Sequence, residues 1–211
     1  MADPAPSGHG APSVIAIDGP AGAGKSTVSA ALAERLGLAR LDTGAMYRAV
    51  AWAALQRGLD PGDTAAVGEL ARALGISVAD RVTVDGTDVT GAIRTPAVNE
   101  AVSVVAANPE VRRELVARQR RWADEHGGGV VEGRDIGTVV FPQARLKVYL
   151  TASPEERARR RDDELAANVA RRDRIDAGRT VSPLKEASDA RALDTTGRSV
   201  EDVVEEVLSW L

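Results

Sequence analysis

Glycines, a lysine and a serine gather within eight residues near the N-terminus of the chain. Residues 19–26, GPAGAGKS, match the spacing G-x-x-x-x-G-K-[ST] in full. Glycines at this spacing let the backbone direct its N–H groups to one point, where a helix N-terminus also favours bound phosphate. Lys25 is expected to contact the β- and γ-phosphates of a nucleoside triphosphate, and the Ser26 hydroxyl to bind Mg²⁺. A Gly-rich turn that only starts a helix is the alternative interpretation.

The elements on either side of this motif favour the phosphate site. Residues 14–17 form a continuous apolar run, which is typical of a strand buried on both faces. Residues 25–36 carry apolar side chains at helical spacing, and Gly37 follows where such a helix would end. The residues predicted to bind ATP are Gly19, Pro20, Ala21, Gly22, Ala23, Gly24, Lys25, Ser26 and Thr27.

The motif alone does not identify the reaction, because GTPases, motor ATPases and small-molecule kinases share it. A GTPase would need an Asn-Lys-x-Asp segment to read its base, and none of Asn99, Asn108 and Asn168 is followed by Lys. A large ATPase would need more than 211 residues. Transfer of the terminal phosphoryl group to a small acceptor is the remaining interpretation.

Two further segments follow predicted strands and could hold that acceptor. In residues 41–48, Thr43 and Arg48 could bind an acceptor phosphate, or they could be an ordinary N-cap and a surface arginine. Residues 132–138 contain two carboxylates and Arg134 on a Gly-flanked turn, a combination that is costly to bury in a core. These charges are therefore expected either in a solvated turn or lining a cleft. A carboxylate in a cleft can accept a hydrogen bond from an exocyclic amino group such as cytosine N4.

Arginines are dense between residues 157 and 179. A mobile segment that brings arginines onto a triphosphate would stabilise a loose phosphoryl-transfer transition state and exclude water. A solvated helix face is the alternative, and we favour it for Arg159 and Arg174. Base composition of the genome could also explain why the basic residues are mostly arginine.

The remaining pattern alternates strands with helices and predicts an α/β fold of the P-loop NTPase type. We expect a parallel sheet of about five strands with helices on both faces. Residues of about 60–95 are expected to form a small inserted lobe with a two- or three-strand sheet around a hairpin turn at Asp85-Gly86. The other expected helices cover residues 43–55, 97–126 with a break at Asn108-Pro109, 153–161 with Ser153 as the N-cap, and 200–211. The other expected strands lie at 130–131, 146–150 and 192–193.

Composition limits the partners and the compartment. The chain has no cysteine, a net charge of −4 and no apolar run long enough for a membrane span. We therefore expect a cytoplasmic protein that binds neither nucleic acid nor membrane and is a monomer. Residues 1–12 resemble a flexible tail rather than a signal peptide, and residues 13–211 a single kinase domain, with a lid at about 154–172.

Together these segments resemble the bacterial cytidylate kinases of the nucleoside monophosphate kinase family. The segments that carry the resemblance are IDGPAGAGKST (17–27), LDTGAMYR (41–48), GTDVTGAIRT (86–95), residues 102–112, VVEGRDIGTVVFP (130–142), SPEERARRR (153–161), RRDRID (171–176), RTVSPL (179–184) and LDTTG (193–197). The resemblance implies transfer from Mg²⁺-bound ATP to CMP or dCMP, and it implies that the insertion at about 60–95 is an enlarged monophosphate-binding lobe.

The resemblance also implies roles for individual residues. The acceptor phosphate would be held by Thr43, Arg48 and Arg134, the cytosine read by Ser103, Arg112 and Asp135, and the sugar contacted by Arg172 and Asp176, with Arg179 reaching toward the acceptor. The expected catalytic residues are Lys25, Arg134, Arg157 and Arg161, of which the last two are lid arginines.

The chain departs from the family pattern at two places. The stretch between Arg161 and Arg171 is shorter than is usual, and Ala177-Gly178 replaces more polar residues. We expect both departures to affect the reaction rate more than the class of substrate. A shikimate-type small-molecule kinase and a slow nucleotide-binding regulator are the alternative functions.

Overall fold

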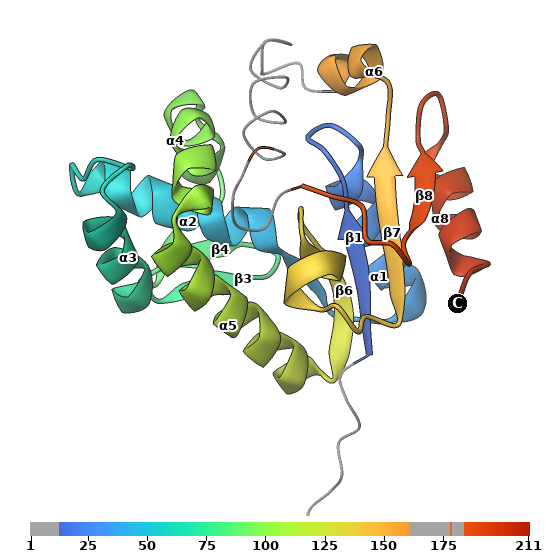
Figure 1. The fold of residues 1–211 in the computed structure, drawn as a ribbon, viewed down its shortest axis with the longest axis horizontal. Coiled ribbons are helices and arrows are strands. Elements are labelled where there is room, and N and C mark those ends of the chain that lie inside the picture. The colour runs from blue at the N-terminus through green and yellow to red at the C-terminus, as the bar shows by residue number, and fades with distance from the viewer. Residues whose placement is uncertain (1–12, 161–177, 179–183) are drawn as a thin grey trace, which may run out of the picture.

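The computed structural model describes residues 13–160, 178 and 184–211. Within this part of the chain, five parallel strands form a central sheet in the order β2-β6-β1-β7-β8 (Figure 1). The strands are β1 (Ser13–Asp18), β2 (Arg40–Asp42), β6 (Gly128–Glu132), β7 (Leu146–Thr151) and β8 (Arg191–Asp194). The predicted α/β fold with about five parallel strands is confirmed.

Helices cover both faces of this sheet. Val14 and Ala16 of β1 pack in a cluster with helices α2 (Thr43–Gln56), α4 (Pro96–Ala107) and α5 (Pro109–His126). Ile15 and Ile17 pack in a second cluster with α1 (Lys25–Leu36) and α8 (Val200–Leu208). Since successive side chains of a strand point to opposite faces, a strand covered on both faces is apolar throughout.

Three neighbouring strands end in an acidic residue at the same edge of the sheet. In the strand register, Glu132 of β6 lies between Ile17 of β1 and Asp42 of β2. Asp18, the last residue of β1, precedes the loop that leads into α1, and Asp42 directly precedes α2. Ligands of open parallel sheets bind at this carboxyl edge, so the fold gathers its charged residues where a site can form.

A small antiparallel sheet lies apart from the main one. It consists of β3 (Ile76–Val78), β4 (Val82–Val84) and β5 (Thr87–Asp88), within the stretch where the sequence predicts a two- or three-strand sheet. Asp85 and Gly86 join β4 to β5 with φ angles of 49° and 80°, as the predicted hairpin turn requires. The sequence analysis did not predict α3 (Thr64–Ala73), a short helix capped by Asp63 that packs at the same end of the molecule (Figure 1).

The predicted helix break at Asn108-Pro109 is confirmed. The Asn108 side chain accepts hydrogen bonds from the N–H groups of Glu110 (2.9 Å) and Val111 (3.4 Å), and so caps α5. A 3₁₀ turn, η1 (Ala92–Arg94), precedes α4, and a π-helical turn, η2 (Ile136–Val140), follows β6. Neither turn was predicted.

The C-terminal part of the described chain holds α6 (Pro154–Arg159), β8 and α8. Ser153 caps α6 by accepting from the Glu156 N–H, as its sequence predicts. Among the residues described, none of the helices combines the length and apolar character that crossing a bilayer requires.

Candidate active site

The loop at residues 19–26 has the conformation that its glycines predict. Gly19, Gly22 and Gly24 have φ angles of 148°, 78° and 87°. A Cβ atom on Gly22 would lie 2.7 Å from the Arg157 carbonyl oxygen, and one on Gly19 only 2.1 Å from that of Leu150. The loop therefore runs close against β7 and α6, and both glycines are required by space as well as by backbone angle.

Lys25 and Ser26 start α1 at the mouth of this loop. Lys25 is buried, and its Nζ donates a hydrogen bond to the Pro20 carbonyl oxygen (2.8 Å) across the loop. Ser26 Oγ donates to Glu132 Oε2 (2.9 Å). Lys25, Ser26 and Glu132 line one large cleft, with a volume of about 660 Å³. Ala21, Gly22 and Gly24 of the loop line it too, whereas Gly19, Pro20 and Ala23 do not.

Glu132 is buried at the end of β6, although a carboxylate is costly to bury. Ser29 Oγ donates to it at 3.0 Å and Arg40 at 3.1 Å, in addition to Ser26. These donors offset part of the burial cost. Burial, followed by the negative charge of Asp42, raises the pKa of Glu132. Of the two alternatives predicted for the charges of residues 132–138, a solvated turn or the lining of a cleft, the second is therefore correct.

Positive charge dominates the large cleft. Besides Lys25, six of the described arginines line it: Arg48, Arg94, Arg134, Arg159, Arg160 and Arg198. A cleft with this lining and an anion-binding loop at its centre suits a polyphosphate.

A smaller pocket of about 70 Å³, here called the acceptor pocket, adjoins the cleft. Gly44, Arg48 and Arg134 line both cavities. The structure brings together in this pocket all six of the described residues that the sequence assigns to the acceptor: Thr43, Arg48, Ser103, Arg112, Arg134 and Asp135. They come from α2, α4, α5 and the turn after β6.

Arg112 and Asp135, which both line the acceptor pocket, form a buried ion pair. Their side chains are 4% and 7% exposed, and the Arg112 guanidinium donates to Asp135 Oδ2. The guanidinium also lies over the Tyr47 ring, 5.7 Å from its centroid. The pair is thus held by α5 and α2 in one orientation, with a donor and an acceptor side by side.

Thr43 and Arg48, which line this pocket, are both held by hydrogen bonds within the protein. Thr43 Oγ1, in the first turn of α2, donates to the Glu132 carbonyl oxygen (2.7 Å). Arg48 donates to Asn99 Oδ1 (2.6 Å) and to the Ile93 carbonyl oxygen (3.0 Å). These contacts connect α2 to the segment that contains the 3₁₀ turn and α4.

The acidic end of β1 fixes the turn that carries Arg134 and Asp135. Asp18 is buried, and its carboxylate accepts from the N–H groups of Ile136 (2.8 Å) and Gly137 (2.7 Å). Burial raises the pKa of Asp18 to about 6, although these two hydrogen bonds and the charge of Lys25 act in the opposite direction. No sequence pattern singled out this residue.

The lid predictions are met only in part by the described residues. Arg157 donates to the Ala21 carbonyl oxygen of the loop (3.2 Å) and does not line the large cleft, whereas its neighbours Arg159 and Arg160 do. The Arg159 side chain is 73% exposed, which agrees with its predicted place on a solvated face. Arg161, Arg172, Asp176 and Arg179 lie outside the described residues.

Sequence reasoning also gave no role to several cleft residues, among them Arg94, Arg160 and Thr195. Arg94 lies within the quoted segment 86–95 and Thr195 within 193–197, but neither received a role. Nothing in the run of arginines at 157–161 distinguishes Arg160 from its neighbours without knowledge of what packs beside it.

Comparison with known proteins gives concordant results. A family model described as cytidylate kinase matches residues 15–211. A protein named cytidylate kinase from Pelotomaculum thermopropionicum is 50% identical over 214 residues, covering 92% of this chain and 94% of its own length. The bifunctional pantoate ligase/cytidylate kinase of Prochlorococcus marinus (strain MIT 9303) is also 50% identical, and this chain spans 44% of its length.

A solved structure shares the fold at low sequence identity. The gluconokinase of Sinorhizobium meliloti 1021 has a TM-score of 0.53 and 15% identity, with 94% of this chain and 91% of that one covered. This likeness concerns the arrangement of strands and helices.

Proposed function

The chain belongs to the cytidylate kinase family, and we propose that it transfers the γ-phosphoryl group of ATP to CMP or dCMP. The products are ADP and CDP or dCDP. The observation that carries this proposal is the pair of cavities that meet at Gly44, Arg48 and Arg134, one built around a phosphate-binding loop and the other around a buried Arg–Asp pair.

The chemistry of the acceptor pocket matches cytosine. Cytosine presents an amino donor at N4 beside acceptors at N3 and O2. Asp135 accepts and Arg112 donates, so the pair complements this edge, and the Ser103 hydroxyl supplies a further group on α4. Uracil presents an acceptor at position 4 and a donor at N3, which would oppose both groups. We therefore expect UMP to be a much poorer acceptor.

Transfer needs charge neutralisation and alignment rather than a covalent enzyme intermediate. An oxygen of the CMP phosphate attacks the γ-phosphorus of ATP, and the bond to the β–γ bridging oxygen breaks as ADP leaves. Arg48 and Arg134, where the cavities meet, would reduce the repulsion between the two phosphates. Lys25 would stabilise the charge on the transferred group.

Mg²⁺ fits the residues at the loop. Ser26 Oγ and Glu132 Oε2 are adjacent oxygen ligands, and the described residues include no cluster of three acidic or imidazole side chains that would form a closed metal site. Magnesium commonly binds through one or two protein oxygens, substrate phosphates and water. We propose that Ser26 and Glu132 hold it, Glu132 acting directly or through water. When bound, the ion neutralises charge on the β- and γ-phosphates.

A panel of acceptors tests the proposal. The protein is incubated with Mg-ATP and, separately, CMP, dCMP, UMP, AMP, GMP, dTMP or shikimate, and ADP formation is measured. The Lys25→Ala variant, which keeps the acceptor pocket, serves as the control, and its kcat should fall about 10²–10³-fold. CMP and dCMP should give the largest rates.

Other results would change specific parts of the proposal. ADP formation only with another acceptor would contradict the cytosine assignment but leave the ATP site intact. Tight ATP binding without ADP formation from any acceptor would favour the regulatory alternative. An unchanged rate in Lys25→Ala would contradict the role of the loop.

We also propose that the enzyme acts as a monomer in the cytoplasm, with its two nucleotides as its only partners. The absence of cysteine suits a reducing compartment, and the net charge of −4 does not suit a nucleic-acid partner.

A further inference from the structure

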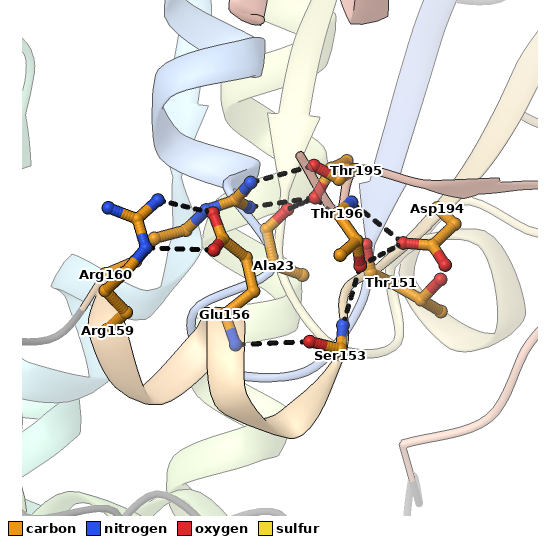
Figure 2. Close-up of polar contacts among 9 residues, drawn as sticks. All are labelled: Ala23, Thr151, Ser153, Glu156, Arg159, Arg160, Asp194, Thr195 and Thr196. Carbon is orange, nitrogen blue, oxygen red and sulfur yellow. Dashed lines mark hydrogen bonds and ion pairs between the residues drawn. The ribbon is translucent and has the colours of Figure 1, made fainter. Parts of the chain in front are cut away.

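Thr195, which lines the large cleft, connects three elements (Figure 2). Its side chain is buried, and its Oγ1 lies 3.2 Å from the carbonyl oxygen of Ala23 in the phosphate-binding loop and 3.0 Å from that of Thr151 in β7. Its N–H also donates to the Thr151 carbonyl oxygen (2.9 Å). The turn formed by residues 195–198, here called the Thr195 turn, is thus attached to both the sheet and the loop.

Arg160, which follows α6, contacts the same residue. Its guanidinium donates to Thr195 Oγ1 (2.8 Å) and to the Thr195 carbonyl oxygen (2.8 Å). Its Nε donates to Glu156 Oε1 (2.8 Å), so one carboxylate of α6 fixes the direction of the side chain. The hydrogen bonds from Arg159 and then from Arg160 hold the pKa of Glu156 at about 2, so this carboxylate is ionised at neutral pH.

The side chains of Arg160 and Arg159 differ in their exposure to solvent. Arg160 is 24% exposed and Arg159 73%, although both contact Glu156. Arg159 donates to Glu156, three residues earlier in α6, whereas Arg160 spans 35 residues to Thr195. A second contact supports the same junction: the Ser153 N–H at the start of α6 donates to Thr196 Oγ1 (2.8 Å).

The position of this junction identifies the ligand that it affects. Thr195, Arg198, Ser199, Val200 and Val203 line the large cleft, whereas none of them lines the acceptor pocket. The contact of Thr195 Oγ1 with the Ala23 carbonyl oxygen (3.2 Å) also places the junction beside the phosphate-binding loop. The junction therefore lies at the part of the cleft where a phosphate donor would bind, here called the donor end.

We propose that Arg160 is a positioning residue for the phosphate donor, because it joins α6 to the Thr195 turn and thereby to the phosphate-binding loop. This inference rests on the proposed kinase function. The arginine fork fixes both the hydroxyl and the carbonyl of Thr195, and the hydroxyl contacts the Ala23 carbonyl. Loss of the fork frees α6 and the turn to move apart, which widens the donor end and leaves the acceptor pocket unchanged.

Binding measurements without turnover test this inference. We would determine the affinity of the magnesium complex of the imido analogue of ATP, and separately that of CMP, by calorimetry for the wild type, Arg160→Gln, Arg160→Lys and Thr195→Val. The analogue should bind about 10-fold more weakly to Arg160→Gln, as expected for the loss of charge-assisted hydrogen bonds. CMP affinity should stay within about twofold. Arg160→Lys should restore little, because an ammonium lacks the fork.

The double variant Arg160→Gln/Thr195→Val distinguishes positioning from direct contact with the nucleotide. If Arg160 acts through Thr195, the loss in the double variant should be smaller than the product of the two single losses. Arg35→Gln is the matched control, since Arg35 links α1 to α8 through Glu205 and does not line the cleft. Its affinity for the analogue should equal that of the wild type.

Three results would overturn the inference. The first is a folded Arg160→Gln protein whose affinity for the analogue is within twofold of wild type. The second is an equal loss of affinity for the analogue and for CMP in that variant. The third is a loss of analogue affinity in the double variant that equals the product of the two single losses. Each is distinct from failure of the proposed function, because the analogue binds without an acceptor. If the wild-type protein binds the analogue but phosphorylates an acceptor other than CMP, the analogue affinities of the variants still test the role of Arg160.

Discussion

Arg112 and Asp135 form a buried ion pair, and removing two charges from water costs free energy. Removing one partner from a buried pair typically costs about 3–5 kcal/mol, because the other charge stays buried without compensation. The pair also rests on Tyr47, so its orientation is set before any nucleotide arrives. This arrangement suits selection between bases better than it suits stability alone.

We predict that Arg112→Met weakens CMP binding by at least about 10-fold, as loss of a charge-assisted hydrogen bond to the base should, and changes ATP binding by less than about twofold. The reason is that Arg112 lines the acceptor pocket and not the large cleft. Steady-state kinetics with each substrate varied in turn measure both effects. The variant's folding is checked by its unfolding transition, which should shift to lower denaturant.

Arg113→Met is the matched control, because Arg113 is the next residue of α5 and its side chain is 70% exposed. It should behave as the wild type with both substrates. Equal losses of CMP and ATP binding in Arg112→Met would remove its role as a base reader.

Asp18 gives a pH-dependent prediction. Its pKa in the folded protein is about 6, above its ordinary value of 3.8. Between these values the folded state binds more protons than the unfolded state, so this group lowers the free energy of unfolding as pH rises from about 4 to about 6. The contribution of Asp18 to the free energy of unfolding is fully present below pH 4 and lost above pH 6. It amounts to about 3 kcal/mol, at 1.36 kcal/mol per pKa unit.

Denaturant unfolding of the wild type and Asp18→Asn at a series of pH values isolates this effect. The difference in the free energy of unfolding, wild type minus variant, should fall between pH 4 and 6 and be constant above. Other titrating groups largely cancel in the difference. A difference that does not change with pH would show that Asp18 ionises normally in the folded protein.

At the scale of the element, the phosphate-binding loop depends on glycine at specific places. Gly22 has a φ of 78°, and an added Cβ would meet the Arg157 carbonyl oxygen at 2.7 Å. We predict that Gly22→Ala lowers both ATP affinity and the free energy of unfolding, the latter by more than the ~1–2 kcal/mol that a left-handed conformation costs. Nucleotide titration and denaturant unfolding measure the two losses.

Gly58→Ala separates crowding from backbone conformation. Gly58 has a φ of 66°, and an added Cβ would have nothing within 4 Å. This variant should lose only the conformational cost and keep full ATP affinity. Equal effects of the two substitutions would mean that the close approach of α6 to the loop has no energetic consequence.

The sequence predicted those elements whose cause is local. The apolar run of β1, the cap at Ser153 and the break at Asn108-Pro109 each depend on residues within a few positions of one another. The π-helical turn η2 depends instead on Asp18, 118 residues earlier in the chain. No pattern within residues 136–140 encodes that contact, so the turn was missed.

The same distinction applies to the site. Motif spacing and family resemblance identified the loop and the acceptor residues. The structure gathers all of the described acceptor residues and most of the loop residues into two adjoining cavities. The buried role of Glu132 and the link between Arg160 and Thr195 arise only when strands distant in sequence become neighbours. Those roles could not be predicted from spacing.

At the scale of the whole molecule, strand order explains why two cavities meet. β1 lies between β6 and β7, and β2 lies beyond β6, so the loop after β1, the turn after β6 and the start of α2 are neighbours at one edge. One hydrophobic cluster packs on each face of the sheet, and the two together hold this edge in place. Ligands that bind there should therefore stabilise the entire fold.

We predict that CMP and Mg-ATP each raise the unfolding temperature when added alone. At 100 times its Kd, a ligand adds about 2.7 kcal/mol, which corresponds to about 5–10 °C for a chain of this size. Thermal unfolding with increasing ligand measures the shift. In Arg112→Met, tenfold weaker binding should reduce the shift with CMP at the same concentration to about half or less, and the shift with Mg-ATP should remain. A wild-type shift with Mg-ATP but none with CMP would contradict an independent acceptor pocket.

The central claim is that the γ-phosphoryl group of ATP moves to the phosphate of CMP. The most direct test supplies ATP labelled with ³²P at the γ position together with CMP and Mg²⁺, and separates the products. The label should appear in CDP at the β position, in amounts equal to the ADP formed, and labelled inorganic phosphate should stay at background. Label released as inorganic phosphate, with none in CDP, would contradict the claim.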